Sequence, residues 1–159
     1  YPCRLNRACC DKSRLLNQPS LLRGFMLHHV SFGVSDIHRS AAFYDAVLSA
    51  LGYVRVWDDI SDDDPDCAVG YGNSNGGDKF AIKLRSQALL GSIPGFHLAF
   101  AAPNRAAVDE FHKAALLHGG TDNGAAGLRP DYGDEYYAAF VIDPDGYHIE
   151  AVINGAEQV

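Results

Sequence analysis

Residues 27–53 read LHHVSFGVSDIHRSAAFYDAVLSALGY, and the fold can be worked out from them. The first part of this stretch alternates between apolar and small or polar residues, which predicts a β-strand over 27–34. Asp36 is a good N-cap, and the apolar residues after it recur at helical spacing, which predicts a helix over 38–50. Three short strand-like runs follow, at 53–57, 67–71 and 79–85. The stretch therefore opens a βαβββ unit.

The same order of elements begins again at residues 96–120, FHLAFAAPNRAAVDEFHKAALLHGG. Five pairs of residues at equivalent places are each 68 apart: His29 and His97, Asp36 and Asn104, Phe43 and Phe111, Ala46 and Ala114, Gly52 and Gly120. The second unit is predicted to hold a strand at 96–102, a helix at 105–118, and strands at 123–129, 136–142 and 147–153. We therefore predict an α+β domain over 26–159, in which two βαβββ repeats (27–87 and 95–153) form a cupped mixed β-sheet with the helices on its outer face.

Composition narrows the classes of function. The chain of 159 residues is 47% hydrophobic and has a formal net charge of −7. This acidity argues against binding to nucleic acid or to an anionic membrane, and no run of 18 apolar residues is present to span a bilayer. The isolated Cys67 and the absence of a CxxC motif argue against a disulfide framework or a thiolate zinc site. We expect a cytoplasmic protein that acts on a small molecule.

The first 25 residues differ from the rest of the chain. They hold five basic residues against only Asp11, a sum of +4, which leaves −11 for residues 26–159. They show no clean strand or helix period, and the only methionine, Met26, directly precedes the first patterned strand. We expect residues 1–25 to be an N-terminal extension outside the core, with Met26 as the natural start. A mitochondrial presequence is the rival interpretation.

Four polar residues lie on the small-residue faces of the predicted strands. His29 and Lys83 belong to the first repeat, and His97 and Glu150 occupy similar places in the second. The opposite faces of these strands are apolar, so the polar faces would line an open cup. Two imidazoles and one carboxylate that met there would form a facial set for Fe(II), Mn(II), Zn(II) or Ni(II). The more ordinary interpretation is that each histidine is structural or faces solvent.

The segments LHHVSFGVSDIHRSAAFYDAVLSALGY, GFHLAFAAP and FVIDPDGYHIEAV resemble the vicinal oxygen chelate superfamily. This superfamily includes glyoxalase I, extradiol dioxygenases and bleomycin-resistance proteins. The DPDG turn followed by a strand glutamate is the most specific part of the resemblance. It implies that His29, His97 and Glu150 bind a divalent metal ion. It also implies a homodimer, because the metal site of such relatives is often shared across a two-fold axis.

The chain departs from glyoxalase I at three places. Lys83 stands where that enzyme has a fourth ligand, a glutamate. Gly33 stands where it has an arginine that binds the glutathione carboxylate, and Gln87 stands where it has an asparagine. We therefore expect little or no lactoylglutathione lyase activity.

Lys83 has several possible roles. Its ammonium could pair with Glu150 and replace the metal, bind an anionic substrate, or act as a base once burial lowers its pKa. It could also be a lysine whose charged end reaches solvent at the rim of the sheet. Ser31 and Arg85 lie on the same predicted face and are further candidates for substrate binding.

The segment 128–137, LRPDYGDEYY, is rich in polar aromatic residues. It could form a lid over the cup, with Arg129, Tyr132, Tyr136 and Tyr137 as substrate-binding residues. The alternative is an ordinary tyrosine-rich loop that packs on the edge of the sheet.

Three functions follow from these residues. The first is a metal-dependent lyase, isomerase or oxidoreductase of the dioxygenase kind, in which the metal polarises a small oxygenated substrate while Lys83 or Glu150 moves a proton. The second is a metal-free protein that sequesters a small ligand, as bleomycin-resistance proteins do. The third is a structural or regulatory dimer with a vestigial site.

Overall fold

The computed structural model describes residues 27–61, 65–86 and 94–155. The predicted extension at 1–25 lies outside these residues. The order of elements is β1 (Val30–Val34), α1 (Ile37–Ala50), β2 (Val54–Asp59), β3 (Ala68–Gly72), β4 (Asp78–Leu84), β5 (Leu98–Ala101), α2 (Arg105–Leu117), β6 (Thr121–Leu128), β7 (Tyr136–Ile142) and β8 (His148–Asn154). The predicted α+β fold of two βαβββ repeats is therefore confirmed.

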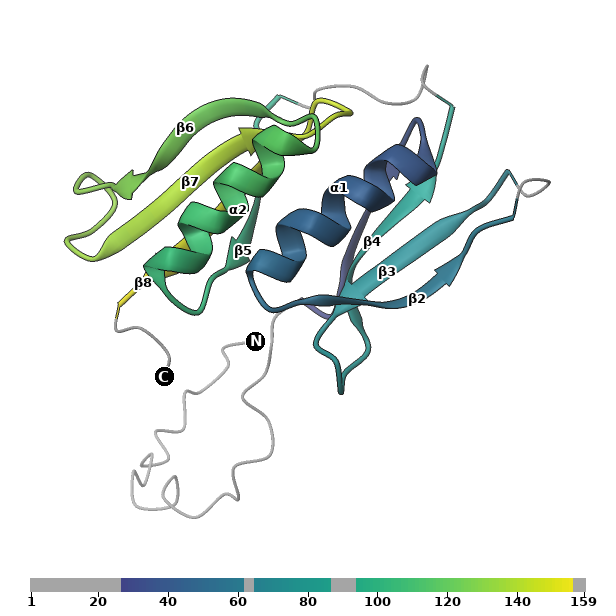
Figure 1. The fold of residues 1–159 in the computed structure, drawn as a ribbon, viewed down its shortest axis with the longest axis horizontal. Coiled ribbons are helices and arrows are strands. Elements are labelled where there is room, and N and C mark those ends of the chain that lie inside the picture. Colours follow the sequence, from purple (N-terminus) through teal and green to yellow (C-terminus); the bar gives the residue numbers. More distant parts are fainter. Residues whose placement is uncertain (1–26, 62–64, 87–93, 156–159) are drawn as a thin grey trace, which may run out of the picture.

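Each repeat builds its own four-stranded sheet, as Figure 1 shows. The strand orders are β1-β4-β3-β2 and β5-β8-β7-β6, so the two sheets have the same topology. In each sheet the first and last strands of the repeat pair in parallel, and the remaining neighbours pair antiparallel. The helix of each repeat supplies the crossover that a parallel pair requires.

The two helices begin where the capping residues predict. The Asp36 carboxylate accepts a hydrogen bond from the Arg39 amide, and the Asn104 side chain accepts one from the Ala107 amide. Both helices lie on the same side of the molecule and pack against each other as well as against their own sheets (Figure 1). The other face of each sheet is therefore left free of helices.

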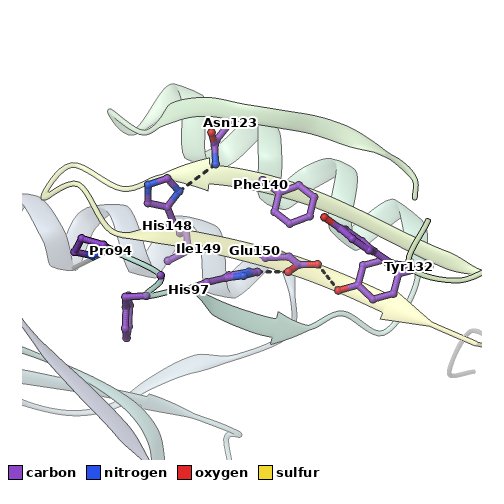
Figure 2. Close-up of a pocket in the computed structure, with 11 residues that line it drawn as sticks. Pro94, His97, Asn123, Tyr132, Phe140, His148, Ile149 and Glu150 are labelled. Carbon is purple, nitrogen blue, oxygen red and sulfur yellow. Dashed lines mark hydrogen bonds and ion pairs between the residues drawn. The ribbon is translucent and has the colours of Figure 1, made fainter. Parts of the chain in front are cut away.

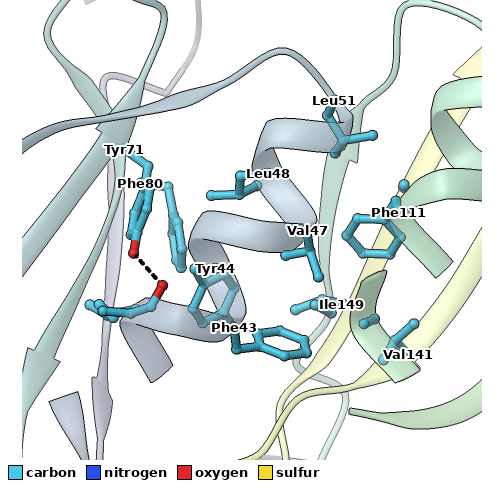
Figure 3. Close-up of a cluster of buried hydrophobic side chains, with 14 of the residues drawn as sticks. Phe43, Tyr44, Val47, Leu48, Leu51, Tyr71, Phe80, Phe111, Val141 and Ile149 are labelled. Atoms are coloured by element: carbon cyan, nitrogen blue, oxygen red, sulfur yellow. Dashed lines mark hydrogen bonds between the residues drawn. The ribbon is translucent and has the colours of Figure 1, made fainter. Parts of the chain in front are cut away.

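The hydrophobic core joins the two repeats along this helix pair. Phe43 of α1 and its equivalent Phe111 of α2 are both fully buried. Figure 3 shows α1 between aromatic residues of the first sheet, Tyr71 and Phe80, and apolar residues of the second repeat. The repeats thus form one continuous core, because each helix covers its own sheet and also the neighbouring helix.

The DPDG turn, residues 143–146, holds the two repeats together with polar contacts. Asp145 accepts hydrogen bonds from the Ser35 amide at 3.0 Å, from the Ser40 hydroxyl at 2.8 Å and from Arg39 at 2.8 Å. Burial raises the pKa of Asp145, but these hydrogen bonds outweigh burial and hold the pKa below its ordinary value. The carboxylate is therefore ionised at neutral pH and fixes the start of α1 against the turn before β8.

Asp143 of the same turn bonds in a buried environment. It accepts a hydrogen bond from the Tyr44 hydroxyl at 2.6 Å and another from the Tyr147 amide at 2.8 Å. Burial raises the pKa of the Asp143 carboxyl and also that of the Tyr44 hydroxyl. Through these two aspartates the turn therefore contacts both the first turn of α1 and the buried Tyr44 further along that helix.

Candidate functional site

The centre of the candidate site is a chain of three side chains on the free face of the second sheet (Figure 2). The His97 Nε2 atom lies 2.7 Å from the Glu150 Oε2 atom. The Tyr136 hydroxyl donates to the other carboxylate oxygen, Oε1, also at 2.7 Å. The side chain of Glu150 is only 2% exposed, whereas that of His97 is 45% exposed. A buried carboxylate is thus held on both sides next to an imidazole that solvent can reach.

Strand pairing explains how these residues meet. β5 and β8 are parallel neighbours, with Ala99 opposite Glu150, and His97 precedes Ala99 by two residues and shares its face. On the other side, β7 pairs antiparallel with β8 and places Phe140 opposite Glu150. Tyr136 lies four residues before Phe140 on the same face, so its ring points to the same carboxylate.

Tyr136 is a stable hydrogen-bond donor. Burial, and then the hydrogen bond to Glu150, raise the pKa of the Tyr136 hydroxyl to about 12. The hydroxyl therefore keeps its proton at neutral pH and orients the carboxylate.

A cavity of about 640 Å³ opens over this chain of residues. His148 lies two residues before Glu150 on the same face, and its Nδ1 atom lies 3.2 Å from the Asn123 amide nitrogen. The cavity is lined by Pro94, Gly95, Phe96, His97, Asn123, Tyr132, Tyr136, Phe140, His148, Ile149 and Glu150. Aromatic and apolar residues line much of it, and a few polar groups from neighbouring strands converge on it, which is the usual character of a small-molecule site.

The first repeat places its histidine at the equivalent position but not in this cavity. His29 directly precedes β1, just as His97 directly precedes β5. Its side chain is exposed, and its Nδ1 atom lies 2.9 Å from that of His28. No group of three histidine, cysteine or acidic side chains within the described ranges could hold a metal ion. One chain therefore brings together two of the three predicted ligands, His97 and Glu150, because each repeat has its own sheet.

The basic residues of the first sheet do not reach Glu150 within the chain. Lys83 is half-buried on β4, between Gly33 of β1 and Ala68 of β3. Arg85 forms an ion pair with Asp66 at 3.0 Å, so its charge is already balanced. Ser31, also predicted to bind substrate, is exposed on the same sheet opposite Ala81.

The segment 128–137 divides between two faces of the second sheet. Tyr132 lines the cavity and packs edge-on against Tyr136, with ring centroids 5.4 Å apart. The Arg129 guanidinium stacks over the Phe140 ring, 5.4 Å from its centroid. Tyr137 instead donates to Asp109 of α2 at 2.7 Å.

The placement of Tyr137 corrects the prediction that it faces the cup with Tyr136. Neighbouring residues of a strand point to opposite faces, so the two tyrosines could not both line the cavity. The same alternation would have found Phe140, which sequence reasoning missed, because it shares the face of Tyr136 on β7. Asn123 and Phe96 were also missed, and no pattern in the sequence distinguishes them.

Comparison with known proteins agrees with this architecture. The sequence model of the Glyoxalase/Bleomycin resistance protein/Dioxygenase superfamily matches residues 26–151. The chain belongs to this superfamily. No curated protein matches the sequence. Among the described residues, no helix is long and apolar enough to cross a membrane.

Solved structures of similar fold cover most of the chain. A glyoxalase/bleomycin resistance protein from Albidiferax ferrireducens is 31% identical, with a TM-score of 0.65, over 80% of this chain and 98% of that one. A family enzyme from Burkholderia phytofirmans is 22% identical, with a TM-score of 0.56, over 78% and 94%. A glyoxalase I mutant from Zea mays is 19% identical, with a TM-score of 0.58, over 78% and 44%. The last two similarities show the fold alone.

Proposed function

We propose that the protein is a cytoplasmic, divalent-metal-dependent enzyme that acts on a small oxygenated substrate. In this proposal His97 and Glu150 bind the metal together with His29 of the partner subunit in a homodimer. The observation that carries the proposal is the 2.7 Å contact between His97 and the buried Glu150 at the base of a 640 Å³ cavity. A buried carboxylate beside an exposed imidazole is a costly arrangement for a structural role alone.

The donor set fits a metal ion only in part within one chain. Nitrogen and carboxylate donors of this kind suit Zn, Ni, Mn or Fe, but a facial set needs three of them. His29 has the required chemistry, is exposed, and occupies the slot of the first repeat that His97 occupies in the second. A two-fold axis that set the first sheet of one subunit against the second sheet of the other would complete the set.

The side chains around the site have distinct roles in this proposal. A bound divalent ion would supply polarisation of the substrate oxygen atoms. Tyr136 holds Glu150 in place, and Tyr132 and Phe140 form the apolar wall against which a substrate packs. Lys83 would contribute a positive charge from the facing sheet, either to bind an anionic substrate or to exchange a proton with it. We place the reaction among lyase, isomerase and dioxygenase chemistry.

A metal-free binding protein is the second candidate. It is favoured by one observation: the Glu150 carboxylate is already satisfied by His97 and Tyr136 without a metal. In that case the cavity would sequester a ligand and leave it unchanged.

Metal analysis separates the two candidates. Protein purified without chelator should contain a divalent ion in stoichiometric amount, and the His97→Ala variant should lose it. His112→Ala is the matched control, because His112 contacts Asp122 away from the cavity and its loss should leave the metal content unchanged. A wild-type protein without metal at pH 7.5 would remove the enzyme proposal and favour the binding protein. A methylglyoxal–glutathione assay should show little or no turnover.

A further inference from the structure

The only tryptophan of the chain lies on the free face of the first sheet. Trp57 of β2 is opposite Gly70 of β3, and a Cβ atom built on Gly70 would lie 2.3 Å from the indole Cε2 and Nε1 atoms. The indole therefore lies across the β3 backbone and occupies the space that a side chain at Gly70 would need. Trp57 is nevertheless 39% exposed, so part of the ring system remains open to a ligand.

Small residues continue this surface across the sheet. Ala81 of β4 pairs with Gly70, and Ser31 of β1 pairs with Ala81. Lys83 follows Ala81 by two residues, so it is the diagonal neighbour of Gly70 on the same face. Diagonal neighbours of a sheet are about 7–8 Å apart, within reach of long side chains. The indole and the ammonium thus border one shallow surface.

Among the described residues, Lys83 has no partner that balances its charge. Within the described ranges no carboxylate lies within ion-pair distance of its Nζ atom, whereas Arg85 at the end of the same strand is paired with Asp66. Asp59 lies on the row of Lys83 but two strands away, about 9–10 Å across the sheet. An unpaired, half-buried ammonium in a chain of net charge −7 favours an anionic ligand.

We propose that Trp57 and Lys83 form a subsite for an aromatic carboxylate. The planar ring packs on the indole, and the carboxylate accepts a hydrogen bond from the Lys83 Nζ atom. The indole lies over Gly70, the diagonal neighbour of Lys83, and the distance of about 7–8 Å between such neighbours suits a ring with one directly attached carboxylate. The inference rests on the proposed function in one respect: it treats the helix-free face of the first sheet as part of the ligand site. It identifies the substrate class as aromatic acids.

Trp57 is the single tryptophan of the sequence, so the tryptophan fluorescence of the protein comes from this residue and should change when a ligand binds to it. In the test, benzoate is titrated into the full-length protein after any bound metal has been removed with a chelator. The fluorescence of Trp57 is followed, with excitation at a wavelength that benzoate does not absorb. Saturable quenching is expected. Cyclohexanecarboxylate should bind about fivefold more weakly because it cannot stack, and neutral benzamide about tenfold more weakly. Equal affinity for all three compounds, or no saturable change with benzoate, would overturn the proposal.

Two variants separate the ring contact from the charge contact. Lys83→Met should weaken benzoate binding about tenfold, whereas Lys113→Met, which removes the same charge from α2, should leave it unchanged. Trp57→Leu, followed by calorimetry and checked for folding by circular dichroism, should remove the preference for benzoate over cyclohexanecarboxylate. Retention of that preference would contradict the role of Trp57. Because the titration uses metal-free protein, its outcome is independent of the metal analysis that tests the proposed function.

Discussion

Replacement of Asp145 by asparagine tests how the DPDG turn holds the two repeats. The carboxylate side chain is 2% exposed and accepts from the Ser35 amide and hydroxyl, from Arg39 and from Ser40. Asparagine has nearly the same shape but no charge, so it keeps the contacts of one oxygen and presents an amide NH2 group, a donor, where Oδ2 accepts from Ser40. The substitution therefore removes charge while it preserves packing.

The expected loss of stability follows from these contacts. A hydrogen bond to a charged group contributes about 1.5–3 kcal/mol, against about 1 kcal/mol for a neutral one. Loss of charge at the three bonds that Oδ1 accepts, from the Ser35 amide and hydroxyl and from Arg39, should lower the free energy of unfolding by about 2–3 kcal/mol at pH 7. For a chain of this length, that loss corresponds to a fall in Tm of roughly 5–10 °C.

The pH dependence has a definite sign. The pKa of Asp145 is held below its ordinary value of 3.8 in the folded protein. Its stabilising contribution is therefore fully present above that value and is lost as the pH falls through the lower, folded pKa. The difference between wild type and Asp145→Asn should thus be constant from pH 7 to about pH 5 and shrink in more acidic solution.

Urea unfolding followed by circular dichroism at a series of pH values measures this difference. Asp58→Asn is the matched control, because Asp58 is 51% exposed and the same change of charge there should cost less than about 0.5 kcal/mol. A loss at pH 7 no larger than that of Asp58→Asn would refute the role of the turn. A difference that grew in acid would refute the assigned direction of the pKa shift.

Further predictions concern the core, the site and the assembly. Tyr136→Phe should cost about 1–3 kcal/mol in urea unfolding, because Glu150 loses a donor. The difference in free energy of unfolding between wild type and Tyr136→Phe should have its full size below pH 10. It should decrease as the pH rises toward 12, the raised pKa of Tyr136. Phe43→Ala should cost about 3–5 kcal/mol in the same assay, since Phe43 is fully buried in the hydrophobic core. Gly70→Ala should shift the Trp57 emission, because its Cβ atom displaces the indole. Light scattering should give twice the 17.2 kDa chain mass, and a monomer would contradict the shared site.

Most of the fold could be predicted because local signals agree with the global arrangement. Asp36 and Asn104 cap their helices at the predicted places, and the offset of 68 residues between the repeats reappears as His29 before β1 and His97 before β5. The first strands of the two repeats are shorter than predicted: the strand at 27–34 is formed only over Val30–Val34, and the strand at 96–102 only over Leu98–Ala101. The alternation of apolar and polar residues shows which residues could form a strand. It does not show where the neighbouring strand ends and pairing stops.

The sequence was sufficient to predict which site residues meet within one sheet, but not how residues of the two sheets lie relative to each other. The pairing of His97 with Glu150 follows from strand order and face, both of which the sequence carries. The position of Lys83 relative to Glu150 depends on how the two sheets are set against each other, which no pattern within a strand encodes. The sequence was sufficient to predict that Tyr136 and Tyr137 point to opposite faces, because successive side chains of a strand alternate between its two faces.

The metal content of a mixed dimer shows whether His29 of one subunit binds the same ion as His97 and Glu150 of the other. One subunit carries His29→Ala and the other His97→Ala, with different affinity tags so that only the mixed dimer is purified. If each site takes His97 and Glu150 from one subunit and His29 from the other, one site of the mixed dimer is intact and the other lacks both histidines. A shared site should give no bound metal in either variant homodimer and one divalent ion per mixed dimer. A mixed dimer without metal, from a wild type that binds it, would contradict the shared site.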